Sequence, residues 1–262
     1  MHAMRVRPAA VAGLFYPGNS QRLRREVESL LAGPVHISHR PKALIAPHAG
    51  YVYSGGVAGK AFALLRGAGA DITRIVTIGP AHYVALRGIA VPTADAFETP
   101  LGTIALDRDA LMELTDLPFV RADDAPHVPE HALEVELPFL QMVLGQFRLI
   151  PLVVGEATPT EVAQALERVW GGAETLVVIS SDLSHYHGYE TACRLDAATA
   201  ALIERGEWQQ LRADNACGFL AIAGFLAEAA ERGLNACRLA LCNSGDTAGD
   251  RARVVGYGAW AF

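Results

Sequence analysis

The stretch Leu44-Ile45-Ala46-Pro47-His48-Ala49-Gly50-Tyr51 begins with apolar residues and turns polar at a histidine. The same change occurs in residues 75–83, which contain His82, and in residues 177–185, which end at His185. Short apolar runs bounded by turn residues are typical of buried strands. In an open α/β sheet the carboxyl ends of the parallel strands share one edge, where ligands bind. We therefore expect these three ends to meet in one polar site.

Outward from these stretches, expected strands alternate with helical segments, which predicts an α/β fold with a central, mostly parallel or mixed sheet flanked by helices. The expected strands are residues 43–46, 75–78, 149–154, 176–179, 237–241 and 254–260, and the expected helices after the first are residues 56–66, 159–170, 189–205 and 218–232. Residues 99–106 indicate an inserted antiparallel piece. With 262 residues, of which 51% are hydrophobic, the chain can bury one core, and we expect one domain over residues 1–262.

Two helix starts are marked by capping residues. Ser20 can cap a first helix that runs to about Leu31, before Gly33 and Pro34. Thr158-Pro159-Thr160-Glu161 combines a cap, a proline at the first helical position and a glutamate that completes a capping box.

Composition limits the partners and the compartment. The chain has 22 Lys and Arg against 28 Asp and Glu, a net charge of -6, and no basic run, so we expect no nucleic-acid partner. Its four cysteines show no Cys-x-x-Cys pair, which favours reduced thiols and a cytoplasmic location. The most apolar late stretch, residues 216–230, contains Glu228 and is shorter than the ~20 residues of a bilayer span. We therefore expect no membrane partner.

His48 and His82 are the first candidate metal ligands. Each follows a proline by one or two residues, which helps to fix the loop, and neutral imidazole binds Fe, Zn or Cu. Two histidines with one carboxylate form a site that suits Fe(II) and oxygen chemistry. The alternative is that each is only a hydrogen-bonded loop histidine.

Further candidates follow the other apolar runs. Asp182 and His185 can face the same way if a helical turn begins there, which would suit a ligand, acid or base role. Alternatively, Ser181 or Asp182 only caps the following helix. His131 and Glu134 have helical i,i+3 spacing and could line one pocket, although a solvated helix end gives the same pattern.

Asp246 and Cys242 lie near the end of another expected strand and could supply a third ligand, although a small buried thiol is the more usual state of such a cysteine. Dinucleotide and phosphate-binding loops, a His-Glu-x-x-His motif and a Gly-x-Ser-x-Gly elbow are all absent from the sequence.

These pieces, in this order, resemble the Memo family, known in prokaryotes as AmmeMemoRadiSam system protein B. The segments that carry the resemblance are residues 7–17, 46–51, 79–82, 130–140, 180–186 and 243–246. The family is similar in fold to the class III extradiol dioxygenases, which implies a helix-flanked sheet with a metal cleft at the strand ends.

The resemblance also implies residue roles. His48 and His82 match the metal-binding histidines of the family, and His131, Asp182 and His185 match residues that line the cleft. In animal members a cysteine completes the site, but Thr247 stands at that position here. The implied cofactor is a divalent metal, Fe(II) first, with Cu or Zn as alternatives.

The leading hypothesis is a dioxygenase-like, metal-dependent oxidoreductase of unknown substrate, with His131 or His185 as acid or base. One alternative is a non-catalytic module that binds a peptide or protein partner in the same cleft, and another is a Zn-dependent hydrolase. The resemblance further implies a functional link to AMMECR-type and radical-SAM proteins.

Overall fold

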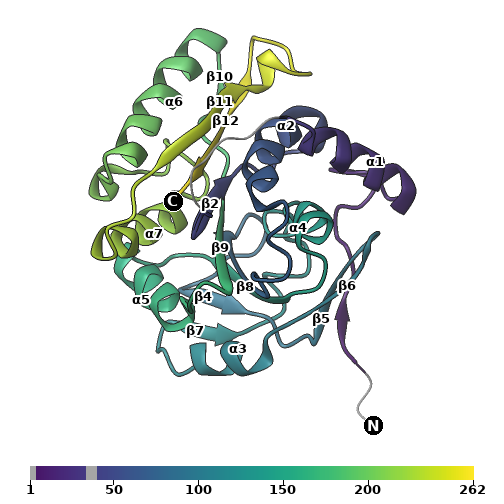
Figure 1. The fold of residues 1–262 in the computed structure, drawn as a ribbon. Coiled ribbons are helices and arrows are strands. Elements are labelled where there is room, and N and C mark those ends of the chain that lie inside the picture. The colour runs from purple at the N-terminus through teal and green to yellow at the C-terminus, as the bar shows by residue number, and fades with distance from the viewer. Residues whose placement is uncertain (1–3, 34–39) are drawn as a thin grey trace.

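Four parallel strands form the centre of the larger sheet in the computed structural model, which describes residues 4–33 and 40–262 (Figure 1). Their order is β2 (Ala43–Ala46), β9 (Thr175–Ser180), β3 (Arg74–Pro80) and β8 (Arg148–Val154). Almost every residue of these strands is buried, as central strands covered on both faces require. The predicted parallel centre is confirmed.

Antiparallel pairs extend this sheet on both sides, so that it is mixed. Beyond β2, the last strand β12 (Val254–Ala261) runs antiparallel to β2, to β11 (Cys237–Asn243) and to β10 (His185–His187). Beyond β8, the short strand β4 (Ile89–Val91) is antiparallel to β8 and parallel to β7 (Val120–Ala122). The three short strands β4, β7 and β10 were not expected from the sequence.

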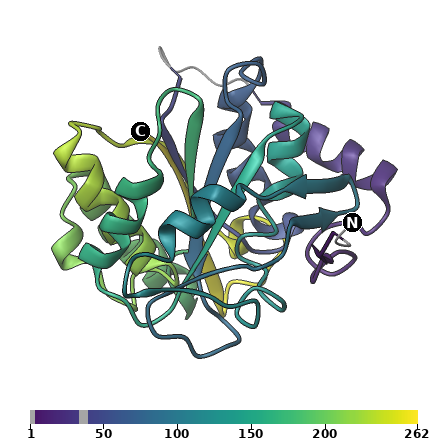
Figure 2. The ribbon, with the colours of Figure 1, turned by 90° about the horizontal axis from the view of Figure 1, so that it is seen from below.

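Helices cover both faces of the sheet, as predicted. Figures 1 and 2 show α1 (Ser20–Leu31), α2 (Tyr51–Phe62) and α4 (Leu137–Leu144) on one side, and α5 (Pro159–Val169), α6 (Tyr189–Glu204) and α7 (Phe219–Glu231) on the other. The remaining helical elements are α3 (Arg108–Leu114), η1 (Ala63–Leu65), η2 (Trp208–Gln210) and η3 (Ser244–Asp246). In the described part of the chain, no helix is long and apolar enough to cross a membrane.

Close helix packing explains one glycine of α2. A Cβ at Gly59 would lie 2.3 Å from the carbonyl oxygen of Leu30 in α1, well inside contact distance. Gly59 therefore allows α1 and α2 to pack backbone against backbone. Most buried apolar side chains, from Val11 to Phe262, belong to one contiguous cluster.

The inserted antiparallel piece is also confirmed. β5 (Ala96–Thr99) and β6 (Gly102–Ala105) form an antiparallel hairpin, and the N-terminal strand β1 (Val6–Arg7) joins it in parallel with β5. This second, three-stranded sheet ties the N-terminal segment to the middle of the chain.

The helix starts agree with the sequence in one case and differ by one residue in the other. Thr158 and Glu161 form the predicted capping box at the start of α5. In α1 the cap is Asn19, whose side chain accepts from the backbone N–H of Arg22, and Ser20 is the first helical residue. Ser20 as the cap was wrong, since asparagine is at least as good a cap as serine.

Candidate metal centre

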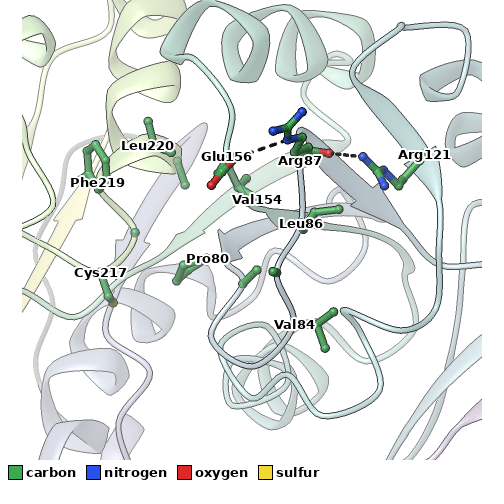
Figure 3. A pocket seen from close by; sticks show the side chains of 15 residues that line it. Pro80, Val84, Leu86, Arg87, Arg121, Val154, Glu156, Cys217, Phe219 and Leu220 are labelled. Atoms are coloured by element: carbon green, nitrogen blue, oxygen red, sulfur yellow. Dashed lines mark hydrogen bonds and ion pairs between the residues drawn. The ribbon is translucent and has the colours of Figure 1, made fainter.

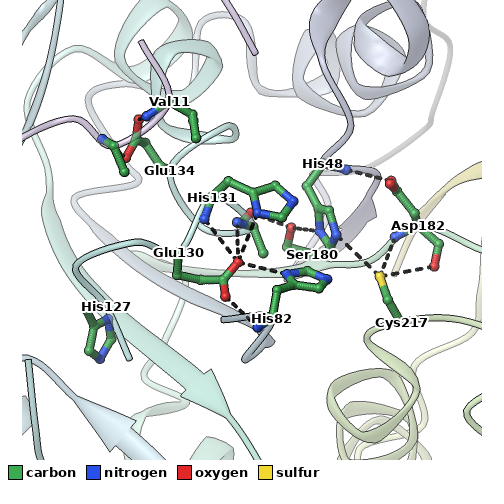
Figure 4. A network of polar contacts seen from close by, with 12 residues as sticks. Val11, His48, His82, His127, Glu130, His131, Glu134, Ser180, Asp182 and Cys217 are labelled. Atoms are coloured by element: carbon green, nitrogen blue, oxygen red, sulfur yellow. Dashed lines mark hydrogen bonds and ion pairs between the residues drawn. The ribbon is translucent and has the colours of Figure 1, made fainter. Parts of the chain in front are cut away.

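The carboxyl ends of the central strands converge, and they bring the expected histidines together. β2 leads to His48 and β3 leads to His82 at the same edge of the sheet. Candidate ligand atoms of His48, His82 and His131 all lie within 4.8 Å of one another. The ring centroid of His48 lies 5.2 Å from that of His82 and 5.3 Å from that of His131. Figure 4 shows the three rings facing a common point.

His131 belongs to this cluster although it is not on a helix. Residues 132–136 form turns, and α4 begins only at Leu137, so the expected helix around His131 was wrong. The ring of His131 stacks on that of His82, with centroids 4.6 Å apart. The sequence placed His131 in the cleft as an acid or base, and the structure places its ring beside the two candidate ligands.

Glu130 supports the ring of His82 and lies beside that of His131. Its Oε1 accepts from Nδ1 of His82 at 2.8 Å and lies 3.3 Å from Nδ1 of His131. Its Oε2 accepts from the backbone N–H of His82 at 2.7 Å. Burial opposes ionisation of Glu130, but the hydrogen bonds from His131 and His82 outweigh it and hold its pKa well below the usual range. A carboxylate on the outer nitrogen is the usual support of a metal-binding histidine, and here it leaves Nε2 of His82 free.

His48 is oriented by a buried chain of polar groups. Its Nδ1 lies 2.8 Å from Oγ of Ser180, and this hydroxyl lies 2.6 Å from the carbonyl oxygen of Ala132 and 3.0 Å from Oε1 of Glu136. Burial raises the pKa of Glu136 well above its usual range, so Glu136 carries a proton. The chain is satisfied when Glu136 and His48 Nδ1 both donate to Ser180, which itself donates to Ala132.

This tautomer leaves Nε2 of His48 with a free lone pair. Burial, together with the neighbouring His131 and His82, holds the pKa of His48 well below its usual value, so the ring is neutral. Nε2 lies 3.3 Å from Sγ of Cys217, and the backbone N–H of Asp182 also points to this sulfur at 3.3 Å. Burial raises the pKa of Cys217 to about 12, so the sulfur is a thiol.

The histidines line a cleft with a volume of about 650 Å³. Its other walls include Asp182 and His185, as expected, although the segment that joins them leads into β10 rather than into a helical turn. Aromatic side chains form much of the remaining wall: Phe15, Tyr53, Tyr83, Tyr186 and Tyr257. The site therefore combines a polar floor with planar, largely apolar walls.

Asp182 and His185 differ in what they can do. Oδ1 of Asp182 accepts from the backbone N–H of His48 at 2.9 Å, which holds the histidine loop in place. Burial raises the pKa of Asp182 to about 7. His185 donates from Nδ1 to the carbonyl of Leu183 at 2.8 Å, which leaves Nε2 as an acceptor, and burial lowers its pKa. His185 is therefore neutral near pH 7 and able to accept a proton.

Glu134 does not line the cleft, contrary to expectation. Because residues 132–136 are turns, its side chain points away from His131 into a buried network. Glu134 accepts from Arg7 at 2.7 Å, from the hydroxyl of Tyr16 at 2.5 Å, and from the backbone N–H groups of Ala10 and Val11. Its effect on the site is indirect: it fixes the N-terminal segment that carries Phe15, whose ring lies 4.7 Å from that of His131.

Cys242 and Asp246 also lie outside the cleft lining. Cys242 is on β11, where burial raises the pKa of its thiol to about 11. Asp246 closes a capping box with Asn243 and accepts from the hydroxyl of Tyr189 at 2.6 Å. Thr247 donates to the carbonyl of Ser244 at 3.1 Å. None of the three joins the histidine cluster: Cys242 stays on β11, Asp246 lies on η3 and Thr247 directly follows it.

A second cavity, of about 570 Å³, lies on the other side of Cys217 (Figure 3). It is lined by the ends of β3 and β8 and by the start of α7, with Arg87 and Arg121 among its residues. Cys217 therefore lines this cavity and also contacts His48.

The sequence reasoning assigned no role to Glu130, Ser180, Glu136 or Cys217. Glu130 was detectable in principle, as an acid directly before a candidate histidine. The roles of the other three depend on which strand and helix ends become neighbours.

Comparison with known proteins places the chain in a family. A model of the family described as Memo-like protein matches residues 7–261. The chain belongs to the Memo family. A MEMO1 family protein of Aquifex aeolicus is 34% identical over 97% of this chain and 98% of its own length. A MEMO1 family protein of Aeropyrum pernix is 34% identical over 97% of this chain and 98% of its own length. A MEMO1 family protein of Thermotoga maritima is 33% identical over 96% of this chain and 97% of its own length.

Proposed function

We propose that this Memo-family chain is a non-haem, metal-dependent oxidoreductase that acts on a small molecule in the cleft. The observation that supports the proposal is the cluster of His48, His82 and His131, with ligand atoms within 4.8 Å of one another on the floor of the cleft. The donor set fits a divalent transition metal, because neutral imidazole binds Fe, Zn and Cu. His131 would be the third ligand, in place of the acid or base role expected from the sequence.

The supports of the rings strengthen this assignment. Glu130 and Ser180 hold the Nδ1 atoms of His82 and His48, which leaves Nε2 of each ring as the atom that would face a metal. A bound Fe(II) would supply the one-electron chemistry that allows dioxygen to react with an organic substrate. Other groups of the chain would bind and orient that substrate.

His185 is the residue that we assign to proton transfer. It lines the same cleft, its Nδ1 is fixed on Leu183, and burial keeps its pKa low. Its free Nε2 would accept a proton from a substrate hydroxyl and return it later. Asp182 would act as a positioning residue, through its hydrogen bond to the backbone of His48.

One observation favours a second candidate function, hydrolysis at Zn²⁺. All three clustered donors are imidazoles, and no carboxylate joins the group among the described residues. Three histidines with an open fourth position form a known type of catalytic zinc site, whereas the iron site with two histidines requires a carboxylate ligand.

The first experiment measures the metal content of anaerobically purified protein by elemental mass spectrometry. Wild type is compared with His131→Ala and with the control His187→Ala, since His187 is exposed and lies outside the cluster. We expect near-stoichiometric metal in wild type and His187→Ala, and loss in His131→Ala. Equal metal in all three would contradict the assignment of His131.

The reaction is then tested with the metal that is recovered. Oxygen consumption with a panel of catechols, measured at an oxygen electrode and lost in His48→Ala, is expected for the oxidoreductase. Zinc with ester hydrolysis and no oxygen uptake would support the second candidate. Absence of metal even after reconstitution would instead indicate a binding module.

A further inference from the structure

Arg253 is the one arginine or lysine among the described residues that line the metal cleft. It precedes β12 directly and is exposed. The two carboxylic acids of the lining are Asp182 and Asp250. Asp182 lies at the buried floor and is bonded to the backbone of His48, and Asp250 accepts from the backbone N–H of Ala252 within its own turn.

The guanidinium of Arg253 is not neutralised by the protein. Within residues 4–33 and 40–262, no carboxylate oxygen lies within 4.0 Å of its nitrogen atoms. The neighbouring Arg251 differs, because it approaches Asp246 at 4.0 Å and stacks on Tyr189, away from the cleft lining. Two arginines on one loop thus have different environments, and the one that lines the cleft lacks an acid partner.

Tyr186 holds Arg253 in this position. The guanidinium carbon lies 5.0 Å from the centroid of the Tyr186 ring, a cation–π arrangement. Tyr186 is the extra residue of a β-bulge, because His185 and His187 pair with the consecutive residues Val255 and Val254 of β12. Bulges beside active sites re-aim side chains.

The backbone conformation of Tyr186 is also unusual. Its φ is 63°, and it is the one non-glycine residue with positive φ in the described chain. Such a conformation is disfavoured for an aromatic residue and is found mainly where function requires it. The ring remains 63% exposed in the cleft wall, so burial of Tyr186 does not account for the bulge.

We propose that Arg253, held by Tyr186, binds the carboxylate of a small substrate with a planar body, which lies between the aromatic walls and points its other end toward the histidines. The proposal rests on the proposed function, since it names the substrate class of the same cleft. A guanidinium fork matches a carboxylate in two hydrogen bonds. The phenyl and phenol rings of Phe15, Tyr53 and Tyr83 suit a flat apolar body.

The test compares benzoate with benzamide, its neutral analogue of the same shape, by isothermal titration of metal-free and Zn-loaded protein. A charge-assisted hydrogen bond predicts that wild type prefers benzoate by roughly tenfold or more. We expect Arg253→Gln to reduce this preference to about two- to threefold, and Arg253→Lys to retain part of it. Arg251→Gln, the matched control, should leave it unchanged.

Each other outcome has a definite meaning. Absence of a benzoate preference in wild type, or of binding by either compound, overturns the proposal. A preference that survives in Arg253→Gln also overturns it, since the anion would then bind the metal or the histidines. If Arg251→Gln loses the benzoate preference to the same extent, the preference comes from general surface charge and the proposal is overturned. If the protein binds metal but does not prefer benzoate, the inference fails and the proposed function stands. If the protein holds no metal but shows a benzoate preference that depends on Arg253, the inference stands and the proposed function fails.

Discussion

The sulfur of Cys217 lies 3.3 Å from Nε2 of His48, the nitrogen that the tautomer of His48 leaves free. The thiol is therefore the present partner of the lone pair that a metal would use. Because burial raises the pKa of Cys217 to about 12, this partner is a weak hydrogen-bond donor and not a thiolate.

Replacement of Cys217 by alanine should tighten metal binding. The metal must displace the thiol from Nε2, and loss of one hydrogen bond of 0.5–1.5 kcal/mol corresponds to roughly two- to tenfold in affinity. A competition titration with Zn²⁺ and a chromophoric chelator measures the change, with Cys237→Ala as control because Cys237 is exposed. If the Zn²⁺ affinity of Cys217→Ala instead falls more than tenfold, the sulfur is itself a metal ligand.

Replacement of Glu130 by glutamine should weaken metal binding by about 10- to 100-fold, the usual effect of losing the group that orients a ligand histidine. The amide has one acceptor oxygen and an NH2 donor, so it cannot replace both Oε1, which accepts from Nδ1 of His82 and the backbone of His131 and Ala132, and Oε2, which accepts from the backbone N–H of His82. The Zn²⁺ competition titration measures the loss of affinity. Glu156→Gln serves as the control, since Glu156 is 82% exposed. Unchanged affinity would exclude an orienting role for Glu130.

Replacement of Glu134 by alanine should destabilise the fold by about 3–5 kcal/mol, because it leaves the buried charge of Arg7 without its partner. The two side chains are only 4% and 0% exposed and 2.7 Å apart. Urea unfolding followed by far-UV circular dichroism measures the loss. Glu207→Ala, which breaks an exposed pair with Arg205, should cost far less, because exposed ion pairs contribute little to stability; equal losses in both variants would refute the argument.

His127 should make stability depend on pH. Burial lowers its pKa from 6.5 to about 4, and its Nε2 donates to the carbonyl of Ala90 at 3.0 Å. The unfolded chain therefore binds more protons than the folded one between these values. Stability is fully present above pH 6.5 and is lost as the pH falls toward 4, by about 3 kcal/mol.

Urea midpoints at pH 7, 5.5 and 4.5 test this, with His127→Gln as the comparison, because glutamine can still donate to Ala90 but does not titrate. The variant should show a flatter profile. Parallel profiles would assign the acid sensitivity to other groups.

The central strands and the two metal-ligand candidates could be predicted because both depend on local patterns. The apolar runs before His48 and His82 identify buried strands, and the sharing of one edge by parallel strands then brings the two residues together. The capping box at Thr158 is equally local. These features need no knowledge of the tertiary structure.

The failures concern residues whose neighbours are distant in the chain. Helical spacing placed Glu134 beside His131, but Arg7, 127 positions away, and the backbone of Ala10 and Val11 compete for its carboxylate. Cys217 meets His48 across 169 positions, and no spacing rule relates them. Cys242 and Asp246 were placed near the site because they come at a strand end, yet Cys242 remains on β11, Asp246 lies on η3, and neither lines the cleft.

The position of β12 in the sheet has a consequence for folding. This strand lies between β2 and β10 and supplies Val255 and Tyr257 to the cleft wall, yet it is more than 200 positions away from β2 in the chain. Strands so distant in sequence pair slowly, because the long loop between them must first close. Until β12 pairs with β2, the cleft lacks that wall.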